Sequence, residues 1–313
     1  MTGRSMETTH PRLQALMARA TAQAGASPQA LGLVYPCDAL ALDAARRIQD
    51  SGMARPVLIG PAALIAAAAD AAQVDVRDFE LVDSGTLAPD AALHACAMAR
   101  SRDLRALMKG SLHTDELMAA VVNKDTGLRA SSRISHAFVF DLPRYHKLLA
   151  LADCVVNIAP DLKTKKDILG NALGLLQKLG IAQPKVGIVA AVEVVNPSIP
   201  ATLDAQALVH MARDGAWPGA IVEGPFGFDN AFSKEAARIK KIESQVAGDA
   251  DLFIMPDLNA GNMLYKSFNY VGGGDCAGLV LGAQVPIVLT SRADSLQSRM
   301  ASVALAVLAA APG

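Results

Sequence analysis

Short apolar runs that alternate with longer helix-like stretches constrain the fold of this chain more than any other feature. Uninterrupted apolar runs of this length are typical of strands buried on both faces of a sheet. They predict strands at residues 31–35, 57–60, 79–83, 137–140, 154–158, 186–195, 220–223, 252–255, 278–281 and 286–289. The stretches between them predict helices at residues 39–51, 62–72, 163–179, 204–214, 233–246 and 295–310.

This alternation predicts an α/β fold with mainly parallel sheets flanked by helices. With 313 residues, of which 52% are hydrophobic and 19% charged, the chain can form one large or two moderate domains. A charged break at residues 141–147 suggests a boundary. The final helix has no strand after it and could pack back on the first domain. We therefore predict a discontinuous first domain, 1–143 plus 293–313, and a second domain, 144–292.

Charge and composition exclude several classes of protein. The net charge of −1 argues against general binding to nucleic acid or a membrane surface, which needs a basic excess. The start of the chain is polar, unlike a secretory signal, and the uncharged stretch 276–291 is shorter than the about 20 residues of a membrane span. No C-x-x-C or metal-ligand spacing joins the cysteines, so we expect a cytoplasmic protein without a metal site. The cysteines are Cys37, Cys96, Cys154 and Cys276.

Two turns that follow predicted strands carry the candidate chemistry, since open parallel sheets bind ligands beyond the carboxyl ends of their strands. Pro256-Asp-Leu-Asn-Ala-Gly-Asn262 leads into a helix that bears Lys266. Free amides at the helix start, side-chain amides and a lysine together suit an anion. The alternative is structural, with Asp257 and Asn259 only capping the helix and Gly261 only permitting a tight turn.

The second turn is Thr290-Ser-Arg-Ala-Asp-Ser295. Ser291 and Arg292 stand at the end of a predicted buried strand, and the planar fork of an arginine matches phosphate oxygens. The alternative is a surface arginine beside a residue that caps the last helix.

Together the two turns resemble the P-D-L-N-x-G-N and S-R signatures of the phosphate acetyltransferase and phosphate butyryltransferase family. Further segments are similar to family motifs, and the resemblance runs from about Leu31 to Ala310. The R-I-S-H and S-R-A-D-S motifs resemble most closely the acyltransferase part of fused enoyl-CoA hydratase/phosphate acetyltransferase proteins. The further matching segments are 109–115, 133–141, 157–161 and 223–225.

The resemblance implies two domains like those of isocitrate and isopropylmalate dehydrogenases, with a cleft between them, and a homodimer. It implies reversible transfer of an acetyl, propionyl or butyryl group between coenzyme A and inorganic phosphate through a ternary complex. Acyl-CoA and phosphate would be the small-molecule substrates. Thioester and acyl phosphate are both activated, so the exchange needs no cofactor, and coenzyme A counts as a substrate.

The resemblance also assigns roles to residues. Those expected to be catalytic are Ser291, Arg292 and Asp294. Those expected to hold phosphate or acyl phosphate are Asn259, Gly261, Asn262, Lys266 and Arg133. Those expected to contact coenzyme A or line the cleft are His113, Gly224, Pro225, Asp257 and Ser295.

One position departs from the family pattern. Acetyltransferases of the family carry an aspartate seven residues after the S-R serine, where this chain has Ser298. Asp294 either replaces that base or caps the last helix. Two other functions stay open: an NAD-dependent hydroxy-acid dehydrogenase of the same fold, and a weakly active acyl-CoA-binding partner of an enoyl-CoA hydratase. Cys276 as an acyl-carrying nucleophile is the less favoured alternative to a small buried residue.

Overall fold

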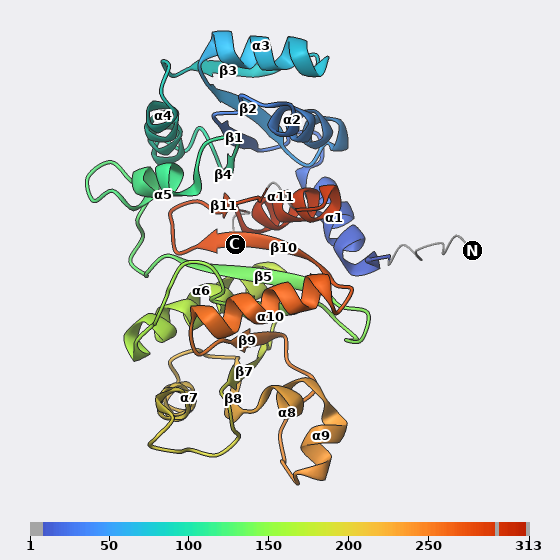
Figure 1. The fold of residues 1–313 in the computed structure, drawn as a ribbon, viewed down its shortest axis with the longest axis vertical. Helices are drawn as coiled ribbons and strands as arrows, with labels where there is room; N and C mark the ends of the chain where they lie inside the picture. The colour runs from blue at the N-terminus through green and yellow to red at the C-terminus, as the bar shows by residue number, and fades with distance from the viewer. Residues whose placement is uncertain (1–8, 292–293, 311–313) are drawn as a thin grey trace. The chain divides into compact units, whose positions relative to one another are not determined.

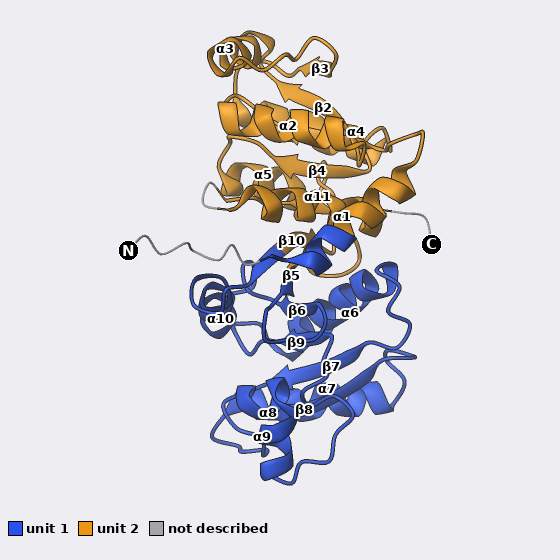
Figure 2. Cartoon of the chain, turned by 90° about the vertical axis from the view of Figure 1, so that its right-hand side faces the viewer, with its two compact units in different colours: residues 1–15, 137–276 blue, residues 16–136, 277–313 orange. Residues whose placement is uncertain are grey.

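The computed structural model describes residues 9–291 and 294–310. Contacts divide the chain into two compact units, coloured separately in Figure 2. Unit 1 comprises Met1–Ala15 and Ala137–Cys276, and unit 2 comprises Leu16–His136 and Ala277–Gly313. The domain boundaries inferred from the sequence stay a prediction, and each unit is described by itself.

Unit 2 is built on a mainly parallel sheet. Its strands β3, β2, β1, β4 and β11 are neighbours in that order and run parallel, and β10 pairs with β11 in the antiparallel sense. The bounds are β1 (Ala30–Val34), β2 (Arg55–Gly60), β3 (Glu80–Asp83), β4 (Ala106–Lys109), β10 (Asp275–Leu281) and β11 (Ile287–Val288). The five residues of β1 are all buried, which explains its uninterrupted apolar sequence.

Helices surround this sheet, as Figure 1 shows. Asp38 caps α2, where its carboxylate accepts a 2.8 Å hydrogen bond from the Ala41 amide, and Gly52 ends it with a left-handed φ of 69°. The final helix α11 packs against α2, β4 and β11 and is buried along most of its length. The bounds are α1 (Pro11–Ala24), α2 (Ala39–Ser51), α3 (Ala62–Ala72), α4 (Ala88–Arg100), α5 (Thr114–Val122) and α11 (Leu296–Ala310).

Unit 1 holds the strands β5, β6, β9, β7 and β8 in that order, parallel except for the antiparallel pair β5–β6. Their bounds are β5 (Ser135–Asp141), β6 (Leu149–Ala152), β7 (Lys185–Val189), β8 (Ile221–Phe226) and β9 (Leu252–Ile254). Its helices are α6 (Leu162–Lys178), α7 (Pro200–Arg213), α8 (Phe228–Phe232), α9 (Lys234–Ile239) and α10 (Leu258–Tyr270).

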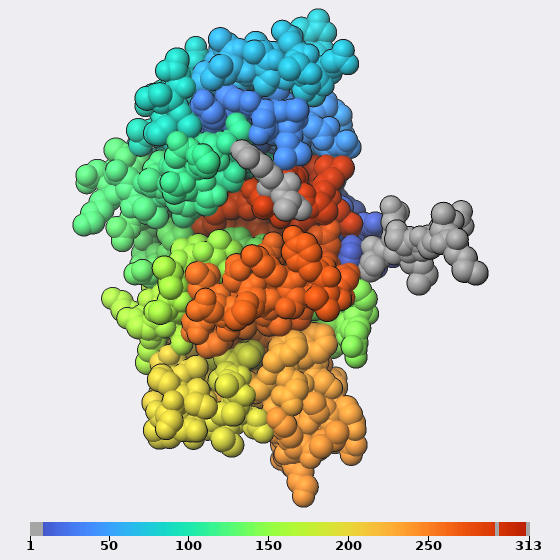
Figure 3. Space-filling model, in the orientation of Figure 1, coloured from blue at the N-terminus to red at the C-terminus, as the bar shows by residue number. Residues whose placement is uncertain are grey.

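An aromatic cluster fixes α10 on the sheet of unit 1. Phe138 of β5 stacks on Tyr265 of α10 with ring centroids 4.1 Å apart, and Phe140 meets Phe268 edge-to-face at 5.2 Å. Such pairs add about 0.5–1.5 kcal/mol each beyond their buried area. The helix, orange in Figures 1 and 3, lies on the face of unit 1 that is turned to the viewer. These contacts hold the second half of α10 on the sheet.

The predicted α/β class with mainly parallel strands is confirmed, and the helices predicted at 39–51 and 62–72 have the observed bounds. One predicted strand is wrong, because residues 154–158 form a turn. The strand predicted at 186–195 is present but ends at Val189. The predicted helix 233–246 ends at Ile239. Sequence analysis missed α1, α4, α5, α8, β4 and β6. Among the described residues, no helix combines the length and the apolar character that crossing a bilayer would require.

Candidate functional site

The turn after β9 opens α10 with a side-chain cap. The Asp257 carboxylate accepts a 3.0 Å hydrogen bond from the Ala260 amide, and the Gly261 amide donates to the Asp257 carbonyl oxygen. The capping role that the sequence left open for Asp257 is thus present. The Leu258 amide donates a 3.0 Å hydrogen bond to the Ile158 carbonyl oxygen. The aligned peptide dipoles still concentrate positive potential at this end of the helix.

Gly261 is required by close packing against a neighbouring turn. A Cβ at this position would lie 2.6 Å from the carbonyl oxygen of Asp153 and 3.1 Å from the Cys154 Sγ. On the next residue, the Asn262 Nδ2 donates a 3.1 Å hydrogen bond to the Cys154 carbonyl oxygen. The start of α10 and the turn after β6 therefore form one packed structure within unit 1.

Asp153 organises that second turn. Its buried carboxylate accepts hydrogen bonds from the amides of Val155 at 2.8 Å and Val156 at 3.0 Å, and from the Asn157 Nδ2 at 2.7 Å. Burial of a carboxylate is tolerated when several donors satisfy it. These bonds curl residues 153–157 into a turn, which is why the apolar run predicted as a strand there is not one.

One face of α10 presents the predicted phosphate-binding residues. Asn259, Asn262 and Lys266 are spaced by three and four residues, which puts them on the same side of a helix. Asn259 and Lys266 are exposed and Asn262 is half-buried. A cation, two amides and the helix amino end thus share one surface, an arrangement that suits an anion.

The turn after β11 is closed by its own acidic residue. The Ser291 amide donates a 2.6 Å hydrogen bond to the Asp294 Oδ2, and the Asp294 amide donates to the Ser291 carbonyl oxygen at 3.2 Å. The Ser295 hydroxyl accepts from the Ser298 amide at 2.9 Å and so caps α11. The predicted phosphate clamp Arg292 lies outside the described residues.

The remaining predicted residues lie at the ends of elements or within a strand. His113 precedes α5, and its amide donates a 2.7 Å hydrogen bond to the Glu116 carboxylate. Arg133 is exposed, two residues before β5. Gly224 and Pro225 lie in β8, and a Cβ on Gly224 would approach the Ile188 carbonyl oxygen to 2.8 Å. The structure brings residues 257–262 together with 153–157, and 291 together with 294–299. Convergence of these two groups, which belong to different units, stays a prediction.

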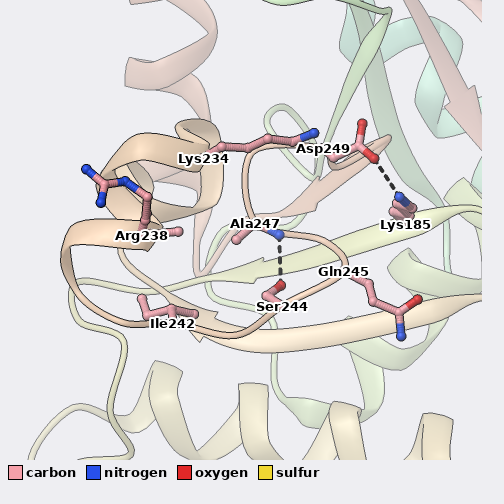
Figure 4. A pocket seen from close by; sticks show the side chains of 9 residues that line it. Lys185, Lys234, Arg238, Ile242, Ser244, Gln245, Ala247 and Asp249 are labelled. Carbon is pink, nitrogen blue, oxygen red and sulfur yellow. Dashed lines mark hydrogen bonds and ion pairs between the residues drawn. The ribbon is translucent and has the colours of Figure 1, made fainter.

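Unit 1 contains a pocket of about 350 Å³, and its lining includes no residue of the turns described above. Figure 4 shows Lys185 paired with Asp249 at 2.5 Å and Ser244 accepting a hydrogen bond from the Ala247 amide. None of the predicted site residues lines it. Its lining residues are Lys185, Lys234, Ala237, Arg238, Ile242, Ser244, Gln245, Ala247 and Asp249.

Within the described residues, neither the cysteines nor clusters of potential metal-binding side chains form a second candidate site. Within residues 9–291 and 294–310, no three or more His, Cys, Asp or Glu side chains gather in a way that could hold a metal ion. Cys276 is buried in the core of unit 1, and burial raises the pKa of the neighbouring Cys154 thiol well above its ordinary value. A buried thiol of this kind is a weak nucleophile.

Sequence reasoning missed two residues that shape the candidate turns, Asp153 and Arg299. A signal for Asp153 was available, because an acidic residue directly after the apolar run 148–152 is a common turn former. Arg299 lies within the predicted last helix, where only its burial reveals a role.

Comparisons with known proteins identify relatives along nearly the whole chain. The model of the family described as "Phosphate acetyl/butaryl transferase" matches residues 84–307. A phosphate acetyltransferase of Rhizobium meliloti is 47% identical over 296 residues, which cover 95% of this chain and 92% of the relative. A phosphate butyryltransferase of Clostridium acetobutylicum is 39% identical, covering 86% of this chain and 89% of the relative.

The fold has a matching solved structure as well. The crystal structure of a branched-chain phosphotransacylase from Enterococcus faecalis V583 superposes with a TM-score of 0.77 and 26% sequence identity. The superposition covers 90% of this chain and 99% of that one.

Proposed function

Since this chain belongs to the phosphate acetyl/butaryl transferase family, we propose that it moves a short acyl group reversibly between coenzyme A and inorganic phosphate. The observation that carries the proposal is the face of α10 formed by Asn259, Asn262 and Lys266 at a helix amino end. That face offers a lysine, two amides and helix dipole charge to one anion, and the reaction has an anion as its second substrate.

The chemistry requires a phosphate oxygen to attack the thioester carbonyl carbon. A C–O bond forms, the C–S bond breaks, and the coenzyme A thiolate leaves and takes up a proton. In this proposal Asn262, Lys266 and the positive amino end of α10 hold phosphate against the carbonyl, which replaces a bimolecular encounter by an oriented one. The Ser291 hydroxyl donates to the developing oxyanion, and Arg292 neutralises phosphate charge. Arg133 and His113 complete the site.

Finer parts of the proposal rest on the resemblance and on composition. The acyl group is acetyl, propionyl or butyryl, and similarity to both an acetyltransferase and a butyryltransferase supports either end of that range. The protein works without a cofactor, is cytoplasmic and forms a homodimer. Pocket walls decide chain length, and one methylene changes discrimination by only about 1–3 kcal/mol.

A thiol-release assay tests the function. We expect coenzyme A to be released from acetyl-, propionyl- or butyryl-CoA only when phosphate or arsenate is added. Comparison of kcat/KM for the three thioesters assigns the chain length. We expect Arg292→Ala to lose most activity, with the exposed Arg100→Met as control. Binding of acyl-CoA in calorimetry without phosphate-dependent release would overturn the transferase, and full activity of Arg292→Ala would overturn the phosphate role of that arginine.

A further inference from the structure

A buried arginine faces the turn after β11 from the first turn of α11. Arg299 is only 6% exposed. Its Nη2 donates to the Ser291 carbonyl oxygen at 2.5 Å, and its Nε donates to the Asp294 carbonyl oxygen at 3.4 Å. The guanidinium thus reaches both ends of the turn that carries Ser291.

The placement of this charge is unfavourable by general electrostatics. Burying a cation is costly unless it is paired, and in the described part of the chain no carboxylate lies within ion-pair distance of Arg299. The first turn of a helix also carries positive potential, which disfavours a cation. The hydrogen bonds to the Ser291 and Asp294 carbonyl oxygens therefore compensate the burial of this cation.

These contacts complete a set that fixes the Ser291 main chain from both sides. Its amide is held by the Asp294 carboxylate at 2.6 Å, and its carbonyl oxygen is held by Arg299. The backbone of Ser291 sets the position of the Cβ that carries the hydroxyl of this exposed residue. With both peptide groups held, the main chain of Ser291 cannot move without breaking charge-assisted hydrogen bonds.

We propose that Arg299 is a positioning residue that holds the main chain of Ser291 in the place from which this serine meets phosphate. The inference rests on the proposed acyl transfer, because it deepens the role of that same turn. Removal of the guanidinium should free the Ser291 main chain and weaken phosphate binding, while acyl-CoA binding changes little. A hydrogen bond to a charged group contributes about 1.5–3 kcal/mol, so the expected effect is about tenfold or more.

Steady-state kinetics of Arg299→Met and Arg299→Lys test the proposal. Methionine keeps much of the apolar volume and removes charge and donors, whereas lysine restores the charge and one donor at a time. We expect Arg299→Met to raise the KM for phosphate about tenfold or more, with the KM for acyl-CoA within about threefold. Arg299→Lys should recover part of the loss, and Arg100→Met, an exposed arginine of unit 2, should behave as wild type.

A folded Arg299→Met variant with wild-type KM for phosphate would overturn the proposal, as would equal rises in both KM values. If Arg299→Met does not fold, Arg299→Gln replaces it, since glutamine is neutral and keeps one donor group. A wild-type KM for phosphate, or equal rises in both KM values, would overturn the proposal for this variant as well. Hydrogen exchange separates this inference from the function. Even if wild type shows no phosphate-dependent release, the amides of Ser291 and Asp294 should exchange faster in the variant, and unchanged exchange would refute the positioning role.

Discussion

The side-chain amide of Asn262 donates a 3.1 Å hydrogen bond to the main-chain carbonyl oxygen of Cys154. This bond joins the first turn of α10 to the turn that the Asp153 carboxylate organises. An NH2 group has two hydrogens, so one N–H fixes the orientation of the amide and the second stays available to a ligand. The proposed phosphate-binding side chain is therefore held in place before any ligand arrives.

Charge at position 262 should matter more than side-chain size. We expect Asn262→Ala to lower kcat/KM for phosphate about tenfold, since it removes a hydrogen bond to a charged ligand. Asn262→Asp should lower it further, because a carboxylate at nearly the same place repels the anion. The measurement is the initial rate of coenzyme A release against phosphate concentration. Asn269→Ala, two turns further along α10, is the control, and equal effects of the two Asn262 variants would contradict the electrostatic argument.

Gly261 should tolerate no side chain. The Cβ of Gly261→Ala would lie 2.6 Å from the Asp153 carbonyl oxygen, so one of the two turns must shift. Overpacking of this kind costs about 1–3 kcal/mol, measured as the free energy of unfolding in urea. Gly174→Ala in α6 is the matched control, because nothing lies within 4 Å of its new Cβ. Gly174→Ala should raise the free energy of unfolding by about 0.5–1 kcal/mol, because alanine favours the helix more than glycine does. If Gly174→Ala instead lowers the free energy of unfolding, the loss caused by Gly261→Ala is not specific to close packing.

The sequence predicts the helices and strands that are specified by their own residues and caps. It misses those whose conformation depends on contacts with residues distant in the sequence. The helices α2 and α3 were predicted with their observed bounds, since a capping Asp38 and a preceding Pro61 mark their starts. Residues 154–158 read as a strand because they are apolar. They turn because the buried Asp153 carboxylate gathers their amides, which periodicity cannot reveal.

The candidate site divides in the same way. The sequence predicts that Asn259, Asn262 and Lys266 act together on an anion because they lie close along one turn and helix. Their common face is read from α10 in the structure. The link between Asn262 and Cys154 joins residues 108 positions apart, and the contact of Arg299 with Ser291 depends on how the turn folds back on α11. Neither contact can be inferred from the sequence pattern, and both are seen only in the folded structure.

Asp294 should act through its acceptor oxygen and not as a base. Its Oδ2 accepts a 2.6 Å hydrogen bond from the Ser291 amide, which engages the carboxylate in the turn. Asp294→Asn keeps an acceptor oxygen and should retain activity within about tenfold, whereas Asp294→Ala loses the bond and should cost more. A free thiol has a pKa near about 8.5, so the leaving thiolate does not depend on this residue for a proton. Rates of both variants across pH 6–9 make the comparison, and equal, severe losses would restore Asp294 as the base.

Acid should weaken unit 1 through the ion-pair cluster around Asp249. Burial raises the pKa of this carboxyl, but hydrogen bonds from Lys185 and His146 and the charge of Lys147 outweigh it and hold the pKa well below its ordinary value. The distances are 2.5 Å to the Lys185 Nζ, 2.8 Å to the His146 Nε2 and 3.3 Å to the Lys147 Nζ. The folded state therefore binds the Asp249 proton more weakly than the unfolded chain does.

Linkage then gives the direction of the pH effect. The stabilisation is fully present above the unfolded pKa of about 3.9 and is lost as the pH falls through that value towards the lower folded pKa. Asp249→Asn should lower the free energy of unfolding by about 1–2 kcal/mol at pH 7, because the side chain is partly exposed and partly screened. The difference from wild type should shrink between pH 4 and pH 2.5. Asp43→Asn, which breaks an exposed pair with Arg47, should change stability less at every pH. A loss at Asp249 that is independent of pH would mean that packing, and not charge, holds this cluster.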